Sequence, residues 1–172
     1  MKIWKFTIAV SIYILAFSLL IFFVPNSLPN RRAEWAQPPM VFICSDSNYS
    51  KKEVDSAIHY WERLGYAFGE VVDDINCSSG YAKNSIVITI PSSSSGFSNP
   101  SDTQKIGKTT SVVDLKNKLI HSAVIEVMIK RDRVLEHEIG HALGWEDFSD
   151  ISHIMHPNHN NGGWDGKGLA VH

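Results

Sequence analysis

The sequence is poor in the features that mark nucleic-acid-binding proteins and repeat proteins. Its 16 lysines and arginines are outnumbered by 18 aspartates and glutamates, and the basic residues are scattered along the chain instead of forming a stripe. A nucleic-acid-binding surface needs clustered positive charge, so we expect no nucleic-acid partner. The sequence also contains no internal repeats. A chain of 172 residues suits one small domain with short additions, and we expect it to be a monomer.

Cysteine is also scarce. The two cysteines, Cys44 and Cys77, lie far apart, and neither has a partner at metal-ligand spacing, which disfavours a Cys/His zinc site. In an exported chain, a single disulfide between them is the natural expectation. Closing this loop would stabilise the fold by about 3–4 kcal/mol in the chain-entropy description. The alternative is a pair of buried free thiols.

Charge is absent from a long N-terminal stretch. No charged side chain occurs between Lys5 and Arg31, and residues 6–24 are mostly apolar. This run is long enough to cross a bilayer, and no small-residue cleavage site of the A-x-A type follows it. We therefore expect residues 1–24 to be a membrane anchor, with the rest of the chain outside the cytoplasm. A cleaved signal peptide, which would give a secreted protein, and a buried core helix are the alternatives.

The rest of the chain divides into a linker and one domain. Prolines punctuate residues 25–39, where we expect an extended tether, and residues 40–172 suit one small domain with one core. The capping box Ser50-Lys-Lys-Glu53 predicts a helix that continues to about Leu64. Asp132 is expected to cap a second helix. Patterns of apolar residues predict strands at residues 40–44, 68–72, 85–90, 108–113 and 119–129.

The most informative stretch is residues 137–147, which read His-Glu-Ile-Gly-His-Ala-Leu-Gly-Trp-Glu-Asp. On a helix, the spacing of His137 and His141 places both imidazoles on one face, one turn apart. Two imidazoles so placed can bind one zinc ion. Glu138 then lies beside the metal and can take a proton from a zinc-bound water. The pattern predicts a catalytic zinc site with Glu138 as the general base.

A third zinc ligand is expected shortly after this helix. Gly144 can adopt a positive φ and end the helix sharply, after which the chain can turn back and present Asp147 to the same metal. A carboxylate oxygen is an acceptable zinc ligand. A glutamate ligand from a later helix is nearly excluded, because no glutamate follows Glu146. The alternatives that remain open are His153, His156, His159 and Asp165.

The pattern HExxHxxGxxD, with a methionine shortly before Pro157, resembles the metzincin clan of zinc metalloproteases, and within it the matrixin-like proteins. The family pattern is HExxHxxGxxH, followed by a turn with a methionine beneath the metal. The residues that match it are His137, Glu138, His141, Gly144 and Met155. Asp147 stands where the family has its third histidine, as an aspartate does in small secreted bacterial members of the snapalysin type. An ordinary core methionine is the alternative interpretation of Met155.

The resemblance also implies a fold. The predicted order of a strand, a helix, several strands and a metal-bearing helix is similar to the layout of a metzincin N-terminal subdomain. We therefore expect an α+β fold after one N-terminal transmembrane helix, with a mixed twisted sheet and two helices, the second carrying HExxH. Matrixin relatives often carry structural calcium, but the sequence has no dense Asp/Gly loop that would require it.

The function implied by the resemblance is that of a zinc-dependent endopeptidase, with Zn²⁺ as cofactor and a protein or peptide as substrate. The substrate would pair in extended form with an edge strand, for which residues 108–113 are the candidate. The Ser-rich loop 91–102 is a candidate to overhang the cleft. The alternative is a membrane-tethered binding or structural protein with a non-catalytic zinc site. Glu138 distinguishes the two, because a structural site needs no general base beside an open coordination position.

Overall fold

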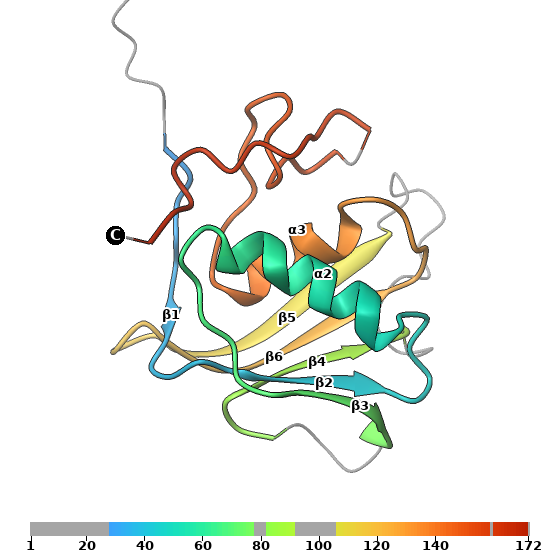
Figure 1. Cartoon of the computed structure of the whole chain (residues 1–172). Coiled ribbons are helices and arrows are strands. Elements are labelled where there is room, and N and C mark those ends of the chain that lie inside the picture. Colours follow the sequence, from blue (N-terminus) through green and yellow to red (C-terminus); the bar gives the residue numbers. More distant parts are fainter. Residues whose placement is uncertain (1–27, 78–81, 92–105, 159, 172) are drawn as a thin grey trace, which may run out of the picture.

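The computed structural model describes residues 28–77, 82–91, 106–158 and 160–171, and places two helices on one face of a sheet (Figure 1). The elements in chain order are β1 (Glu34–Trp35), β2 (Met40–Cys44), α2 (Lys51–Glu62), β3 (Val71–Ile75), β4 (Ser85–Thr89), β5 (Gly107–Asp114), β6 (Leu119–Val127) and α3 (Val134–Ala142). The chain after α3 has neither helix nor strand in its described residues, and it crosses above the helices as loops.

The six strands form one sheet in the order β1-β6-β4-β2-β3, with β5 also paired to β6. Every pairing is parallel except that of β5 with β6. Residues 122–126 of β6 pair with both β4 and β5, so these two strands lie on opposite sides of β6. β5 is therefore an edge strand of the described sheet, with one row of backbone N–H and C=O groups facing away from it.

The predicted fold class is wrong. We expected an α+β fold with a mixed sheet after a transmembrane helix, whereas the sheet is mostly parallel. The long connection from β2 through α2 to β3 allows this arrangement, because parallel neighbours need a crossover that returns to the same end of the sheet. In the part of the chain that the structure describes, no helix has the length and apolarity needed to cross a membrane. The predicted anchor, residues 1–24 with the apolar run 6–24, lies outside those residues.

Most of the predicted elements are present; apart from shifts of one or two residues at other ends, the differences concern β3, β1 and α3. β3 begins at Val71 instead of residue 68. β1 was not predicted, and it lies in the stretch that the sequence suggests is a tether. α3 begins directly after Arg133, whose φ of 69° is left-handed, and no capping side chain precedes the helix. The expected Asp132 cap is therefore wrong.

The core lies between the sheet and the two helices. α2 begins at the predicted capping box, where the backbone N–H of Ser50 donates to Oε2 of Glu53 at 2.9 Å. Its apolar face is buried as the spacing predicts. Trp61 on this face is fully buried, and its indole N–H donates to the carbonyl of Glu136 in α3 at 2.8 Å. This contact fixes α2 against the helix that carries HExxH.

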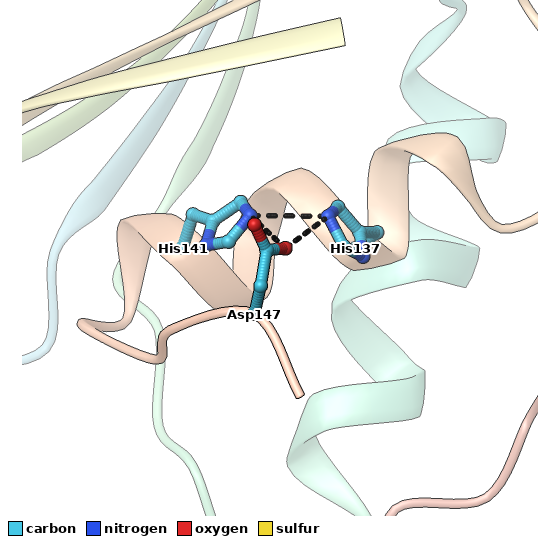
Figure 2. A group of neighbouring side chains, drawn as sticks. All are labelled: His137, His141 and Asp147. Carbon is cyan, nitrogen blue, oxygen red and sulfur yellow. Dashed lines mark hydrogen bonds and ion pairs between the residues drawn. The ribbon is translucent and has the colours of Figure 1, made fainter. Parts of the chain in front are cut away.

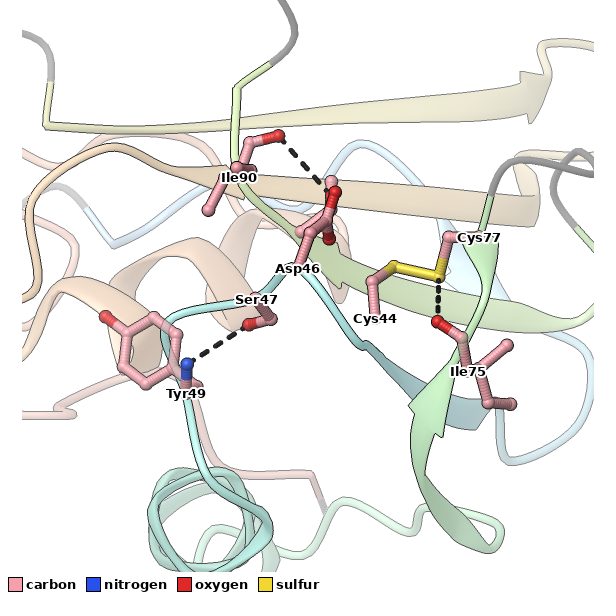
Figure 3. Close-up of a disulfide and its surroundings, with 8 residues drawn as sticks. Cys44, Asp46, Ser47, Tyr49, Ile75, Cys77 and Ile90 are labelled. Carbon is pink, nitrogen blue, oxygen red and sulfur yellow. Dashed lines mark hydrogen bonds between the residues drawn. A yellow bond between two sulfur atoms is a disulfide. The ribbon is translucent and has the colours of Figure 1, made fainter.

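The predicted disulfide is present. Cys44 ends β2 and Cys77 follows β3, and because these strands are parallel neighbours their ends lie side by side (Figure 3). The two Cα atoms are 5.5 Å apart, a normal separation for a disulfide. The bond joins the strands at the point where β3 leaves the sheet. It is expected to stabilise the fold by about 3–4 kcal/mol through the loop it closes.

Gly140 lies at a close contact between α3 and its neighbours. A Cβ at this position would overlap the Sδ of Met155 and lie 2.7 Å from Cζ2 of Trp61. Both neighbours are fully buried and have nowhere to move. We expect Gly140→Ala to lower the free energy of unfolding by about 1–3 kcal/mol through overpacking, measured by urea denaturation of the metal-free protein. Gly69→Ala is the control, because its Cβ would meet Met40 at an ordinary 3.4 Å. Equal midpoints for the two variants would contradict this packing argument.

Candidate metal centre

Three side chains converge at a half-buried face of α3 (Figure 2). His137 and His141 project from successive turns of the helix, and their Nε2 atoms are 3.0 Å apart. Asp147 lies on the segment that turns back after the helix. Its Oδ1 is 3.5 Å from Nε2 of His137 and 3.4 Å from Nε2 of His141. The structure thus brings together the two histidines of HExxH and the predicted third ligand.

The separations within this group suit a zinc ion. A tetrahedral zinc with bonds of about 2.0–2.1 Å keeps its ligand atoms about 3.3–3.4 Å apart. The three observed separations are 3.0, 3.4 and 3.5 Å, close to this value. Two imidazoles and one carboxylate are also the kind of donor set that zinc takes in catalytic sites, where three protein ligands leave one position open.

Backbone carbonyls orient both imidazoles. Nδ1 of His137 donates to the carbonyl of Ile154 at 2.8 Å, and Nδ1 of His141 donates to the carbonyl of Trp145 at 2.8 Å. Because a carbonyl can only accept, the proton of each neutral ring lies on Nδ1. Both Nε2 lone pairs are then left to point at the space beside Asp147. Hydrogen bonding of the second ring nitrogen is typical of histidines that bind metals.

The charges in the group are mutually supporting even without a cation. Burial acts to lower the pKa of His141, but in the metal-free site the protonated ring can donate from Nε2 to Asp147. This bond and the charge of nearby Glu138 outweigh burial, so the pKa is raised. The hydrogen bond from His141 in turn holds the pKa of Asp147 below its usual value, against the opposing effect of burial. Asp147 is therefore a carboxylate at neutral pH, which is the form that a metal ligand requires.

Glu138 lies beside the two histidines and is held against β5. Its side chain is almost fully buried, and burial raises the pKa of its carboxyl group. The hydroxyl of Thr109 lies 2.6 Å from Oε2 of Glu138 as a donor. A Cβ on Gly107 would come within 2.5 Å of Oε1, so the absence of a side chain at this position makes room for the carboxylate.

A cleft of about 1030 Å³ runs over these groups. One wall comes from β5, and the other comes from the segment that follows Met155. The three candidate ligands and Glu138 all line it. The predicted overhanging loop, residues 91–102, lies almost entirely outside the described residues. The candidate metal group is therefore open to a large ligand, such as a peptide, from the side of the edge strand.

Met155 packs against the helix that carries the two histidines. Its side chain is fully buried and packs against Gly140, which lies between the two histidines of α3. The residue before it, Ile154, supplies the carbonyl that orients His137. The turn that contains Met155 therefore supports the first histidine both by packing and through this hydrogen bond.

The rival ligands are engaged elsewhere. The buried ring of His153 accepts the backbone N–H of Met155 at 3.0 Å, and its other nitrogen lies 3.2 Å from the carbonyl of Lys167. Asp165 accepts the backbone N–H of Lys167 at 3.0 Å. His156 lines the cleft but accepts from the backbone of Asn158, and His159 lies outside the described residues. Among the described residues, the group that could hold a metal is His137, His141 and Asp147.

Sequence reasoning missed the groups that support the site from a distance. Thr109 and Gly107 are 29 and 31 residues before Glu138 along the chain, and nothing in their local sequence marks them. Alternation along β5 could have placed both on the same face of the strand. It could not have shown that this face meets the carboxylate of Glu138.

Comparison of the chain with models of known protein families gives no match, and comparison with curated proteins gives none either.

Proposed function

We propose that this protein is a zinc-dependent endopeptidase of the metzincin type, similar to matrixins but with Asp147 as the third ligand. The observation that carries the proposal is the buried carboxylate of Glu138 beside three convergent ligand groups at the floor of an open cleft. A structural zinc site is usually closed by four protein ligands and has no need of a buried base. The alternative of a non-catalytic zinc site is therefore disfavoured.

Zinc bound to His137, His141 and Asp147 would polarise the scissile carbonyl and lower the pKa of a bound water to about 7. Glu138 accepts a proton from the attacking water at its carboxylate and later delivers it to the leaving nitrogen. The hydroxyl of Thr109 keeps the carboxylate from rotating away from the cleft.

The substrate is proposed to be a protein or peptide chain in extended form. β5 lies along the cleft with its outer edge unpaired among the described residues, so a peptide can add to the sheet there through backbone hydrogen bonds. The lining residues of β5 nearest Glu138 are Gly107 and Thr109. Because Gly107 has no side chain and that of Thr109 is small, a peptide backbone can come close to the general base.

The proposed place of action is outside the reducing cytosol. The disulfide between Cys44 and Cys77 supports this, because structural disulfides form and persist in oxidising compartments.

The proposal is tested by metal analysis and by digestion of a mixed peptide library with the full chain. We expect one zinc ion per folded chain by elemental analysis, and cleavage products by mass spectrometry that disappear with a chelator and return when zinc is restored. Stoichiometric zinc without any chelator-sensitive cleavage would instead favour a binding or structural protein. A folded chain that takes up no zinc would remove the basis of both interpretations.

A further inference from the structure

The N-terminal strap, which we define as residues 30–35, lies against the segment that carries the third ligand. This segment, residues 143–147, links α3 to Asp147, and it follows the strap by more than 100 residues in sequence. Arg31 and Trp145 form an isolated β-bridge that joins the two segments. A Cβ on Gly144, whose φ is 95°, would overlap the carbonyl of Ala33. The two backbones are therefore as close as a glycine allows.

The strap caps the C-terminal end of α3. The last carbonyls of a helix have no partners within it and must be satisfied from outside. The indole N–H of Trp35 donates to the carbonyl of Ala142 at 2.8 Å. Arg31 donates through Nε to Leu143 at 3.0 Å, and the backbone N–H of Arg32 donates to Gly144 at 2.8 Å. Three successive carbonyls at the end of the metal-bearing helix are thus bound by one distant segment.

The strap also holds Glu146, the residue directly before Asp147. Its backbone N–H donates to the carbonyl of Asn30 at 3.0 Å. The amide of Asn30 donates to Oε2 of Glu146 at 2.6 Å, and the guanidinium of Arg32 donates to Oε1. Glu146 is therefore bound to the strap through both its backbone and its side chain. Such partly exposed contacts add little to global stability. They do fix the position and direction of the backbone at Glu146, and therefore the place from which Asp147 starts.

Two parts of the metal group depend on this segment. Asp147 follows Glu146 directly, and the carbonyl of Trp145 orients the imidazole of His141. The guanidinium of Arg31 lies 5.8 Å from the centre of the Trp145 ring, which is a further contact on the same residue. The third ligand thus directly follows a residue that the strap binds, and the carbonyl that orients the second ligand belongs to Trp145, which lies between two such residues.

We infer that residues 30–35 are a positioning element of the metal centre, with Asn30 and Arg32 as the residues that set Asp147 in place; this inference rests on the zinc site of the proposed function. Loss of partners that orient zinc ligands typically weakens metal binding by about 10–100-fold. The strap should act in the same way, through the position of Asp147 and not through the stability of the fold.

The test is the zinc affinity of the full chain carrying Asn30→Ala and Arg32→Ala together, measured by competition with a chelating indicator. We expect zinc binding about 10–100-fold weaker than in the parent, with the urea midpoint of the metal-free protein almost unchanged. The control is Lys51→Ala, which removes an exposed ion pair with Asp55 (3.0 Å) on α2, away from the strap and from the cleft. This control should bind zinc like the parent.

A second variant separates positioning from simple damage. Exchanging the charges, with Arg32→Glu and Glu146→Arg in one chain, should restore part of the affinity that Arg32→Glu alone removes. Parent-like affinity in the Asn30/Arg32 variant would overturn the inference, and so would a loss of affinity matched by an equal loss of metal-free stability. Because the measured quantity is zinc affinity, the result does not depend on peptide cleavage. A parent protein that binds zinc without cleaving peptides would contradict the proposed function but not the inference about the strap.

Discussion

Glu138→Gln should reduce peptide hydrolysis by about 10²–10⁴-fold, the usual contribution of a general acid–base group, while one zinc ion stays bound. Glutamine has nearly the same shape, and its amide can still contact the hydroxyl of Thr109, so the fold and the metal ligands should be undisturbed. What it cannot do is accept the proton of the attacking water. The measurement is kcat/KM on a peptide identified from the library, together with the zinc content of the purified variant.

Glu136→Gln is the matched control for this variant. Glu136 lies on the same helix and is also largely withdrawn from solvent, and burial raises the pKa of its carboxyl group as it does for Glu138. It does not line the cleft. Its replacement should therefore leave hydrolysis close to that of the parent. If Glu138→Gln kept near-parent activity, the carboxylate would not be the base, and a binding role would become the better interpretation of the site.

Features that depend on interactions between neighbouring residues were predicted from the sequence, whereas features that depend on contacts between distant segments were not. Local patterns placed most helices and strands, since apolar spacing, capping residues and a positive-φ glycine act within a few residues. The direction of strand pairing depends on crossovers and on contacts between distant segments, so local patterns did not show that the sheet is mostly parallel. β1 was missed because a two-residue strand next to prolines carries no periodic signal.

The same division holds within the candidate site. His137, Glu138 and His141 are recognisable because a helix converts their spacing into one face, and Asp147 follows from the turn at Gly144. The sequence does not show what holds them. Thr109 approaches from β5, and Asn30 and Arg32 approach from the other end of the chain. Each of these contacts exists only once the sheet has brought distant segments together.

Asp147→Ala should weaken zinc binding by more than about 100-fold, beyond the 10–100-fold typical for the loss of an orienting partner, because it removes a ligand outright. The side chain of Asp147 is 54% exposed, so its truncation leaves no buried cavity and should change the urea midpoint of the metal-free protein little. The same exposure leaves room for a larger ring. Asp147→His should therefore retain much of the affinity, since imidazole nitrogen is an equally good zinc ligand.

The rival ligands supply the controls for this last prediction. Asp165→Ala removes a carboxylate that accepts the backbone N–H of Lys167, and His156→Ala removes a ring that lines the cleft without joining the metal group. Both variants should bind zinc within a few-fold of the parent, because neither changes the three convergent ligand atoms. Parent-like binding by Asp147→Ala, together with a large loss in either control, would move the third ligand away from Asp147. The two histidines of α3 and the buried carboxylate of Glu138 would then still define the centre, since their geometry does not depend on Asp147.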